Sequence, residues 1–255
     1  MGSVSQKAAL FAALHRPGDP LILFNVWDAG SARAVAEGGA KAIATGSHSV
    51  AEAHGFGDAE MLPLELVLAN AARIVGAVDL PVTVDFEGAY ATEPEVGAEN
   101  IRRLAETGAV GCNLEDQVVG GQGLHPTALQ AERIRAARRA AGSEFFINAR
   151  TDMFLKAKAD THDEGMVEAA LERARAYADA GASGFFAPGL VDLRLLGQLC
   201  AASPLPVNFI AIPGAPGAAE VAAAGVARIS HGPFPYRAAM KALEAAAREA
   251  HGLTG

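Results

Sequence analysis

Short apolar runs alternate with longer amphipathic stretches along almost the whole chain. Four times an amphipathic stretch ends in a small residue and a glycine, and an apolar run follows at once, as in residues 180–187 (AGASGFFA). A glycine at the end of a helix can adopt the left-handed conformation that stops the helix. Strands that alternate with helices through such short turns predict a parallel sheet.

Eight apolar runs have the length and composition of buried strands. They are Leu21–Asn25, Ala40–Thr45, Leu80–Asp85, Val110–Leu114, Glu144–Ala149, Ser183–Ala187, Pro206–Ile210 and Val226–Ser230. Helical patterns separate or follow them, among them Glu95–Thr107, Thr127–Ala141, Asp163–Ala180 and Tyr236–His251. Eight strand–helix units in 255 residues predict an α/β fold of the (β/α)₈ TIM-barrel type. No GxGxxG motif follows the first strand, which weakens the alternative of a dinucleotide-binding open sheet.

The chain shows no composition break or low-complexity linker, so residues 1–255 are expected to form one domain. A helix over Val4–His15 precedes the first strand and is expected to cap the floor or the side of the barrel. The formal net charge is −8 and no Lys/Arg-rich run occurs, which argues against nucleic acid or an anionic membrane as a partner. The two cysteines lack CxxC spacing, and neither a secretory leader nor a membrane-spanning run is found, so we expect a soluble, cytoplasmic protein.

Acidic residues gather where the third and fourth strands end, which is the end of a barrel that carries its chemistry. Asp85 and Glu87 lie two residues apart, so the alternation of side chains along a strand predicts that they point the same way. Glu115 ends the next strand. Three converging carboxylates predict a site for a hard divalent cation, Mg²⁺ or Mn²⁺, and the alternative is that they are solvated in loops.

Arg150, at the end of the fifth strand, has two interpretations. It could form an ion pair with Asp152 or Glu115, or its planar guanidinium could bind a substrate carboxylate in a bidentate manner. Backbone N–H groups of Gly46 and Ser47 could hold an oxyanion, because glycine permits close approach. Two further residues, Thr45 and Asn208, complete the predicted substrate-binding set.

The glycine-rich stretch Val118–Pro126 follows Glu115 closely. It is expected to be either a mobile lid over the site or simply a flexible loop. Its histidine, His125, is accordingly either an acid/base on the lid or a surface residue. Cys112 alternates away from Asn113 and is expected to pack against the helices.

Four motifs occur in a fixed order: NVWDAGSAR at 25–33, DFEGAY at 85–90, NLEDQ at 113–117 and NARTD at 148–152. With them the sequence resembles the isocitrate lyase/phosphoenolpyruvate mutase superfamily over residues 21–235. The resemblance implies a Mg²⁺-dependent barrel that acts on small 2-oxo or 2-hydroxy acids by cleaving or forming C–C or P–C bonds through a pyruvate enolate. It also implies a homo-oligomer, commonly a tetramer built as a dimer of dimers, whose last helix is exchanged between subunits.

Position by position, the resemblance implies roles for individual residues. Asp85, Glu87 and Glu115 correspond to the metal-binding acids, and Asp58 corresponds to an acid of the metal shell. Arg150 matches the carboxylate-binding arginine, and Gly46 and Ser47 match the loop that holds the substrate oxygens.

The sequence departs from the superfamily pattern at three places. Glu87 stands where many members carry Asp. The lid sequence 121–125 is GQGLH, which keeps the histidine but lacks the cysteine of the Lys-Arg-Cys-Gly-His lid of isocitrate and methylisocitrate lyases. Gln117 replaces a lysine of the phosphonopyruvate enzymes.

The expected function is therefore a Mg²⁺-dependent lyase or decarboxylase of a small oxo acid, such as oxaloacetate or a 2-methylmalate-like compound, with His125 as a proton carrier. The alternatives are P–C bond chemistry on phosphonopyruvate, a catalytically silent 2-oxo acid binder, and a phosphate-binding barrel that uses residues 213–217 and 230–232.

Overall fold

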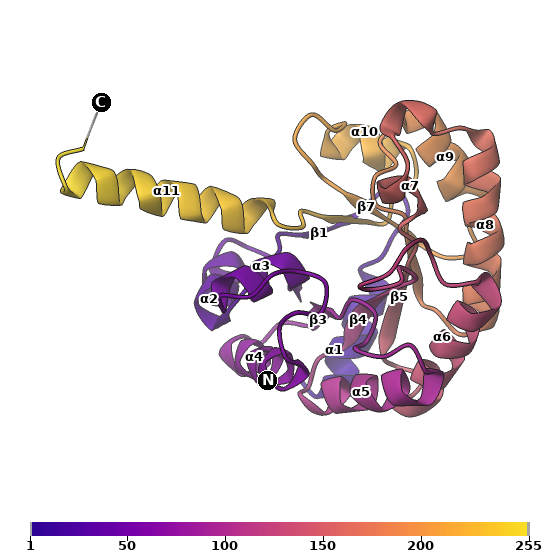
Figure 1. Cartoon of the computed structure of the whole chain (residues 1–255), viewed down its shortest axis with the longest axis horizontal. Coiled ribbons are helices and arrows are strands. Elements are labelled where there is room, and N and C mark those ends of the chain that lie inside the picture. Colours follow the sequence, from indigo (N-terminus) through magenta and orange to yellow (C-terminus); the bar gives the residue numbers. More distant parts are fainter. Residues whose placement is uncertain (1, 254–255) are drawn as a thin grey trace.

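Eight parallel strands form a nearly closed barrel that helices surround (Figure 1). The computed structural model describes residues 2–253. The strands are β1 (Leu21–Leu23), β2 (Ile43–Ala44), β3 (Val82–Asp85), β4 (Gly111–Glu115), β5 (Phe146–Arg150), β6 (Gly184–Phe186), β7 (Val207–Ile210) and β8 (Arg228–Ser230). Neighbouring strands pair in the order β1-β8-β7-β6-β5-β4-β3-β2, and a parallel bridge between Val26 and Thr45 links the two ends. The predicted TIM-type barrel is confirmed.

The helices follow the strands as the sequence pattern predicts. They are α1 (Val4–Ala13), α2 (Ala29–Glu37), α3 (Ser47–Ala53), α4 (Leu64–Ala77), α5 (Pro94–Glu106), α6 (Thr127–Ala141), α7 (Met153–Lys156), α8 (Glu164–Asp179), α9 (Leu193–Ala202), α10 (Ala218–Ala223) and α11 (Phe234–Ala250). α6 has the predicted bounds, and α5, α8 and α11 begin and end within two residues of prediction. The short helix α3 was not predicted. It begins at Ser47, three residues after the end of β2.

The N-terminal helix α1 closes the floor of the barrel, which is one of the two places predicted for it. Phe11 is fully buried and meets Phe146, the first residue of β5, edge to face with ring centroids 5.2 Å apart. His15 stacks on the same Phe146 ring at 4.2 Å. Aromatic pairs of this kind add to the burial of apolar area, so α1 seals the end of the barrel opposite the strand termini that carry the acids.

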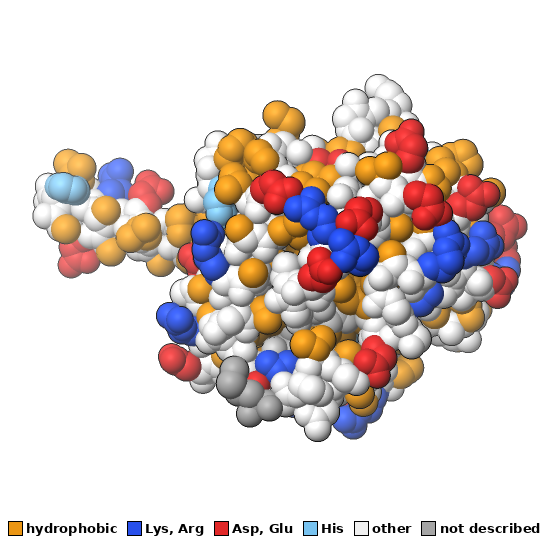
Figure 2. Space-filling view, turned by 90° about the horizontal axis from the view of Figure 1, so that it is seen from below, with side chains coloured by type: hydrophobic (Ala, Val, Ile, Leu, Met, Phe, Trp, Pro, Cys, Tyr) orange, Lys and Arg blue, Asp and Glu red, His pale blue; other side chains and the backbone are white. Residues whose placement is uncertain are grey.

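The last helix, α11, extends away from the barrel, with the C-terminal end of the chain at its far end (Figure 1). Its base is anchored where Tyr236 meets Trp27 edge to face at 5.1 Å. Further along, Leu243 is 63% exposed, and Figure 2 shows the projecting helix carrying both hydrophobic and charged side chains. On the outer surface of β1, Ile22 and Phe24 are also exposed, beside a groove of about 640 Å³ between β1 and α2.

The described helices also bear on membrane association. None within residues 2–253 is both long enough and apolar enough to cross a membrane.

Candidate active site

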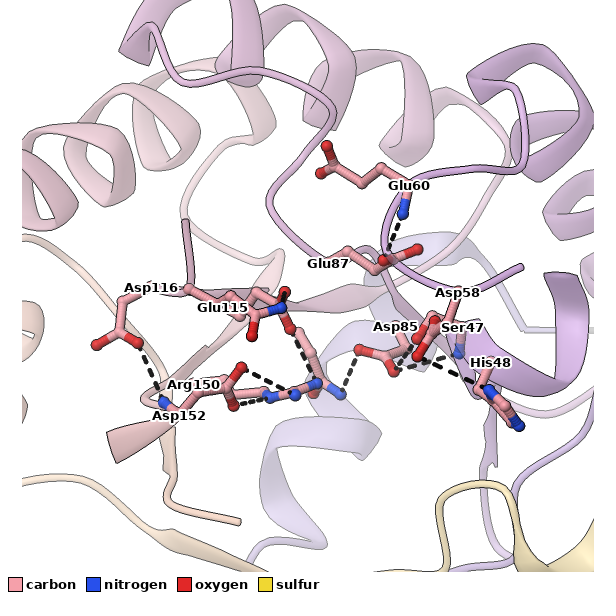
Figure 3. A network of polar contacts seen from close by, with 12 residues as sticks. Ser47, His48, Asp58, Glu60, Asp85, Glu87, Glu115, Asp116, Arg150 and Asp152 are labelled. Atoms are coloured by element: carbon pink, nitrogen blue, oxygen red, sulfur yellow. Dashed lines mark hydrogen bonds and ion pairs between the residues drawn. The ribbon is translucent and has the colours of Figure 1, made fainter. Parts of the chain in front are cut away.

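Asp85 lies at the centre of the polar network at the strand ends (Figure 3). Its Oδ2 accepts hydrogen bonds from Ser47, through the backbone N–H at 3.2 Å and the hydroxyl at 3.1 Å. Its Oδ1 accepts from the side-chain amide of Asn113 at 3.1 Å. Its own N–H donates to Thr45 Oγ1 at 3.0 Å. Donors from the start of α3 and from β4 thus fix the carboxylate, and Thr45, just after β2, fixes the backbone of the same residue.

Gly46 has a different place from the one predicted for it. Its N–H donates to Val26 O at 3.3 Å, in the link that joins β1 to β2. A side chain here would come within 3.4 Å of Gly232 O, so glycine permits the close approach of the two loops. Ser47 is therefore the residue of this pair whose donors face the acids.

Glu87 does reach the site, but not along a strand. β3 ends at Asp85, and Glu87 lies in the following turn with φ of +48°. The prediction from strand alternation was therefore wrong in its geometry, because the left-handed backbone turns the chain after Phe86. Glu87 Oε2 accepts the backbone N–H of Glu60 at 2.8 Å, and Glu60 Oε1 accepts the N–H of Tyr90 at 2.8 Å.

The two loops around Glu87 concentrate unusual backbone conformations. Non-glycine residues with positive φ are Ala59, Glu60, Glu87, Ala89 and Tyr90. Each such residue costs of the order of 1 kcal/mol or more and persists only where surrounding contacts fix it. The crossed hydrogen bonds of Glu60 supply those contacts, which gives Glu87 a rigid support.

Arg150 lies between two buried carboxylates. Its Nη1 is 3.0 Å from Glu115 Oε2, and its Nε and Nη2 donate to Asp152 at 2.6 and 3.1 Å. Burial raises the pKa of Glu115, and Arg150 opposes that rise. The ion-pair role foreseen for Arg150 is confirmed with both partners, while its role toward a substrate carboxylate stays a prediction.

Asp58 lies at the rim, beside His48. The distance from its Oδ2 to His48 Nδ1 is 3.8 Å, and its side chain is about half exposed. The negative charge of Asp58 still acts on Glu87. Burial raises the pKa of Glu87 to about 8, and the charges of Asp85 and Asp58 add to that rise. The predicted rim acid therefore faces the same cluster as the acids of β3 and β4 (Figure 3).

The donor set fits a hard divalent cation. Asp58, Asp85 and Glu87 offer oxygen ligands, and repulsion from Asp85 and Asp58 adds to burial in raising the pKa of Glu87. Within residues 2–253, however, no group of three or more His, Cys, Asp or Glu side chains is already arranged to hold an ion. Arg150 draws Glu115 to one side and Glu60 fixes Glu87 on the other. That Asp85, Glu87 and Glu115 hold an ion together stays a prediction.

The glycine-rich stretch forms a short hairpin-like turn. Gln117 and Leu124 form an antiparallel bridge, and Val118 N–H donates to Gly123 O at 3.2 Å. His125 is only 6% exposed, and its N–H donates to Asp116 O at 2.7 Å. Burial lowers the pKa of His125. The alternative of a surface histidine is therefore wrong.

A polar pocket of about 120 Å³ lies between this turn and the loop after β3. Its lining includes Glu60, Tyr90, Gln117, His125 and Arg133. Arg133 is buried and donates to Gly88 O and Ala91 O, so it holds the β3 loop from below. Neither Glu60 nor Arg133 was singled out from the sequence. Arg133 could have been, since it shares the buried face of α6 with Gln130, Ile134 and Ala137 at helical spacing.

Asn208 lies below the site, inside the barrel. Its Oδ1 accepts from Asn148 at 3.1 Å, and its Nδ2 donates to Phe209 O at 2.7 Å. Asn148 in turn donates to Asn113 at 2.8 Å. Asn208 is thus connected to Asp85 through other amides, and its substrate-binding role stays a prediction.

The sequence family model for phosphoenolpyruvate phosphomutase matches residues 11–251. The chain belongs to the phosphoenolpyruvate mutase/isocitrate lyase superfamily. The superfamily resemblance in the motifs is thereby confirmed. The match spans every strand of the barrel and all the acids described above.

Three relatives cover most of the chain. A provisionally assigned phosphonomutase from Burkholderia cenocepacia J2315 is 53% identical, with a TM-score of 0.95 over 97% of this chain and 100% of that one. Rv1998c, a Mycobacterium tuberculosis protein of no assigned activity, is 36% identical over 93% of this chain and 87% of its own length. A 2,3-dimethylmalate lyase is 29% identical, with a TM-score of 0.80 over 99% and 87% of the two chains. The superfamily relatives thus include lyases and mutases, which makes this chain an enzyme candidate of that class.

Proposed function

We propose that this protein is a Mg²⁺-dependent lyase that breaks a carbon–carbon bond of a small 2-oxo or 2-hydroxy acid, either by retro-aldol cleavage or by decarboxylation. The observation that carries the proposal is Asp85, held by Ser47 and Asn113 in an acidic cluster whose Glu115 is paired with the guanidinium of Arg150. Mg²⁺ or Mn²⁺, when bound, supplies positive charge toward which the oxygens of a 2-oxo acid turn.

The chain's own residues then have distinct tasks. Asp85 and Glu87 provide negative charge for the ion. Ser47 has a hydroxyl that can rotate from Asp85 to a substrate oxygen, and its backbone N–H points toward the same side of the site. Arg150 keeps a guanidinium beside the site, held in orientation by Asp152, for the substrate carboxylate.

In retro-aldol cleavage the hydroxyl group loses its proton as its carbon becomes a carbonyl, and the electron pair of the broken bond stays on the neighbouring carbon, which then takes a proton. In decarboxylation carbon dioxide leaves, the electron pair stays on the carbon next to the 2-oxo group, and that carbon takes a proton that comes from water. We assign the proton transfer to His125: it takes the proton from the hydroxyl group or from water and gives it to that carbon. Its burial favours the neutral imidazole, which can accept a proton in one step and return it in another. The pocket beside His125 would receive the part of the substrate beyond the 2-oxo group, and its polar lining favours a substituent that forms hydrogen bonds.

The proposal is supported by a protein of the same fold. The structure of a phosphonopyruvate hydrolase, 19% identical to this chain, contains oxalate and Mg²⁺. Oxalate has two adjacent carboxyl groups and resembles the enolate of a 2-oxo acid. We therefore expect oxalate to compete with the substrate of this enzyme.

The proposal is tested by incubating the protein with a panel of 2-oxo and 2-hydroxy acids in Mg²⁺ and in EDTA. We expect one member to be cleaved in Mg²⁺ only, and oxalate to inhibit the reaction. An Asp85→Asn variant should lose the activity, whereas Asp19→Asn, at an exposed position away from the site, should keep it. Turnover that persists in EDTA would contradict the proposal.

A second candidate, P–C bond chemistry on phosphonopyruvate, is favoured by the 53% identity to the provisionally assigned phosphonomutase. Gln117 argues against P–C chemistry, because it occupies the position of a lysine in the phosphonopyruvate enzymes. Its neutral amide donates to Glu115 at 3.3 Å. Including phosphonopyruvate in the panel separates the two: phosphate release or conversion to phosphoenolpyruvate would identify P–C chemistry.

We also propose a homo-oligomer in which α11 of one subunit covers the groove beside β1 of another. Ile22 and Phe24 lie exposed at that groove, on the outer surface of the barrel. In a closed barrel this surface is covered by the ring of helices that follow the strands. α11 leaves its own barrel instead of covering it (Figure 1) and carries the exposed Leu243. Apolar surfaces of this extent are normally covered by a partner.

A further inference from the structure

Arg228 is a cation buried inside the barrel, beneath the acids of the site. It is the first residue of β8 and is 1% exposed. Burial lowers the pKa of Arg228 to about 10, and the charge of Asp85 opposes that shift. In the described part of the chain, its Nε and Nη1 have no hydrogen-bond partner. A buried charge with incomplete hydrogen bonding is expensive, and an aliphatic side chain would fill the same space at lower cost.

The contact that Arg228 does make leads to Asp85. Its Nη2 donates to Asn113 Oδ1 at 3.2 Å. The same Oδ1 accepts from Asn148 at 2.8 Å, and Asn113 Nδ2 donates to Asp85 Oδ1 at 3.1 Å. With two donors on its oxygen, the Asn113 amide can present only its NH₂ group to Asp85. If the amide turned over, its oxygen would face a carboxylate and its NH₂ would face a guanidinium.

We propose that Arg228 is a positioning residue: through Asn113 it orients the Asp85 carboxylate and stabilises its charge, and so sets the affinity of the site for its divalent cation. The inference rests on the proposed function, in which Asp85 holds that cation. Outer-shell partners of metal ligands typically contribute 10- to 100-fold in affinity. Violations of packing rules in proteins also concentrate at functional sites, and an unpaired buried guanidinium is such a violation.

A purely structural role predicts the opposite response to substitution. If Arg228 stabilised the barrel, Arg228→Met would lower the melting temperature and leave metal binding per folded molecule unchanged. If it positions Asp85, the same variant removes a buried charge whose hydrogen bonding is incomplete, so stability holds or rises while the metal affinity falls. Stability and affinity therefore move in opposite directions only under the proposal.

The experiment measures Mn²⁺ binding by electron paramagnetic resonance, together with thermal unfolding, for the full chain and four variants. Arg228→Met and Asn113→Ala each interrupt the connection, and we expect at least tenfold weaker Mn²⁺ binding from both. Arg228→Lys keeps a donor toward Asn113 and should lose less. Arg138→Met is the matched control: this partly buried arginine donates to Gly142 O and Phe145 O, away from the acids. It should lower the melting temperature and leave Mn²⁺ affinity unchanged.

The outcomes separate this inference from the proposed function. If the wild-type protein binds Mn²⁺ and both Arg228→Met and Asn113→Ala bind it with the same affinity, the positioning role alone is overturned. Failure of the wild-type protein to bind Mn²⁺ would overturn the proposed function and this inference with it. If Arg228→Met does not fold, Asn113→Ala and Arg228→Lys decide the matter, because both retain a polar barrel interior.

Discussion

His15 provides a pH-dependent test of how α1 closes the barrel. Its ring stacks on Phe146, and its Nδ1 lies 2.8 Å from Phe11 O, so Nδ1 carries the proton and Nε2 does not. Burial lowers the pKa of His15 to about 3, and the charge of Arg228 adds to the effect. In the unfolded chain the pKa returns to about 6.5.

The direction in which stability changes with pH follows from the folded and the unfolded pKa of His15. Between pH 3 and 6.5 the unfolded chain binds a proton at His15 that the folded protein excludes, so stability is lost as the pH falls below about 6.5. One pKa unit corresponds to about 1.36 kcal/mol. Between pH 7.5 and 5.5 this single group should therefore cost about 1.4 kcal/mol of unfolding free energy, and about 2.7 kcal/mol by pH 4.5.

Urea unfolding at pH 7.5 and 5.5, at one protein concentration, measures this cost. The variant His15→Phe keeps the stacking on Phe146 but cannot be protonated, so its stability should fall by about 1.4 kcal/mol less than that of the wild type. The control His251→Gln, at an exposed position, should follow the wild type. Equal losses in the wild type and His15→Phe would refute the buried neutral state of His15.

Three further predictions concern the site, a thiol and the last helix. Arg150→Met leaves Glu115 and Asp152 buried without their cation, so the unfolding free energy should fall by about 3–5 kcal/mol in urea titrations; a loss below 1 kcal/mol would contradict the ion pairs. Burial raises the pKa of Cys112 to about 12, so iodoacetamide should not modify it in the folded protein at pH 8; rapid labelling detected by mass spectrometry would show that this strand opens. Ending the chain after Arg237 removes most of α11 and should reduce the molar mass in light scattering to that of a monomer; an unchanged mass would show that α11 is not the exchanged element.

The barrel could be predicted from the sequence because its signals are local. Apolar runs of strand length and glycines at helix ends recur at each unit, and all eight strands lie within the predicted ranges or one residue beyond them. Seven of the eight ranges began one to three residues before the observed strand, because the apolar run starts in the turn that precedes the strand. Positions such as Glu115, Arg150 and Ser47 follow directly from where a strand ends.

The finer geometry of the site could not be predicted, because it depends on contacts between distant segments. Glu87 was expected to continue the side-chain alternation of the third strand, but the left-handed turn after Phe86 places it, and its support comes from Glu60 in another loop. In the sequence, Arg228 is a single charged residue in an apolar strand, and nothing near it in the sequence indicates its contact with Asn113. Charged residues inside a strand pattern are a usable signal, and in this chain they indicate the polar interior of the barrel.

If Asp85 and its neighbouring acids hold a divalent cation against which a 2-oxo acid binds, oxalate should bind only when that cation is present. Calorimetric titration of oxalate into the wild-type protein, once in Mg²⁺ and once in EDTA, measures this dependence. We expect oxalate binding in Mg²⁺ that disappears in EDTA and in Asp85→Asn. Oxalate binding of equal strength in both solutions would rule out the cation site.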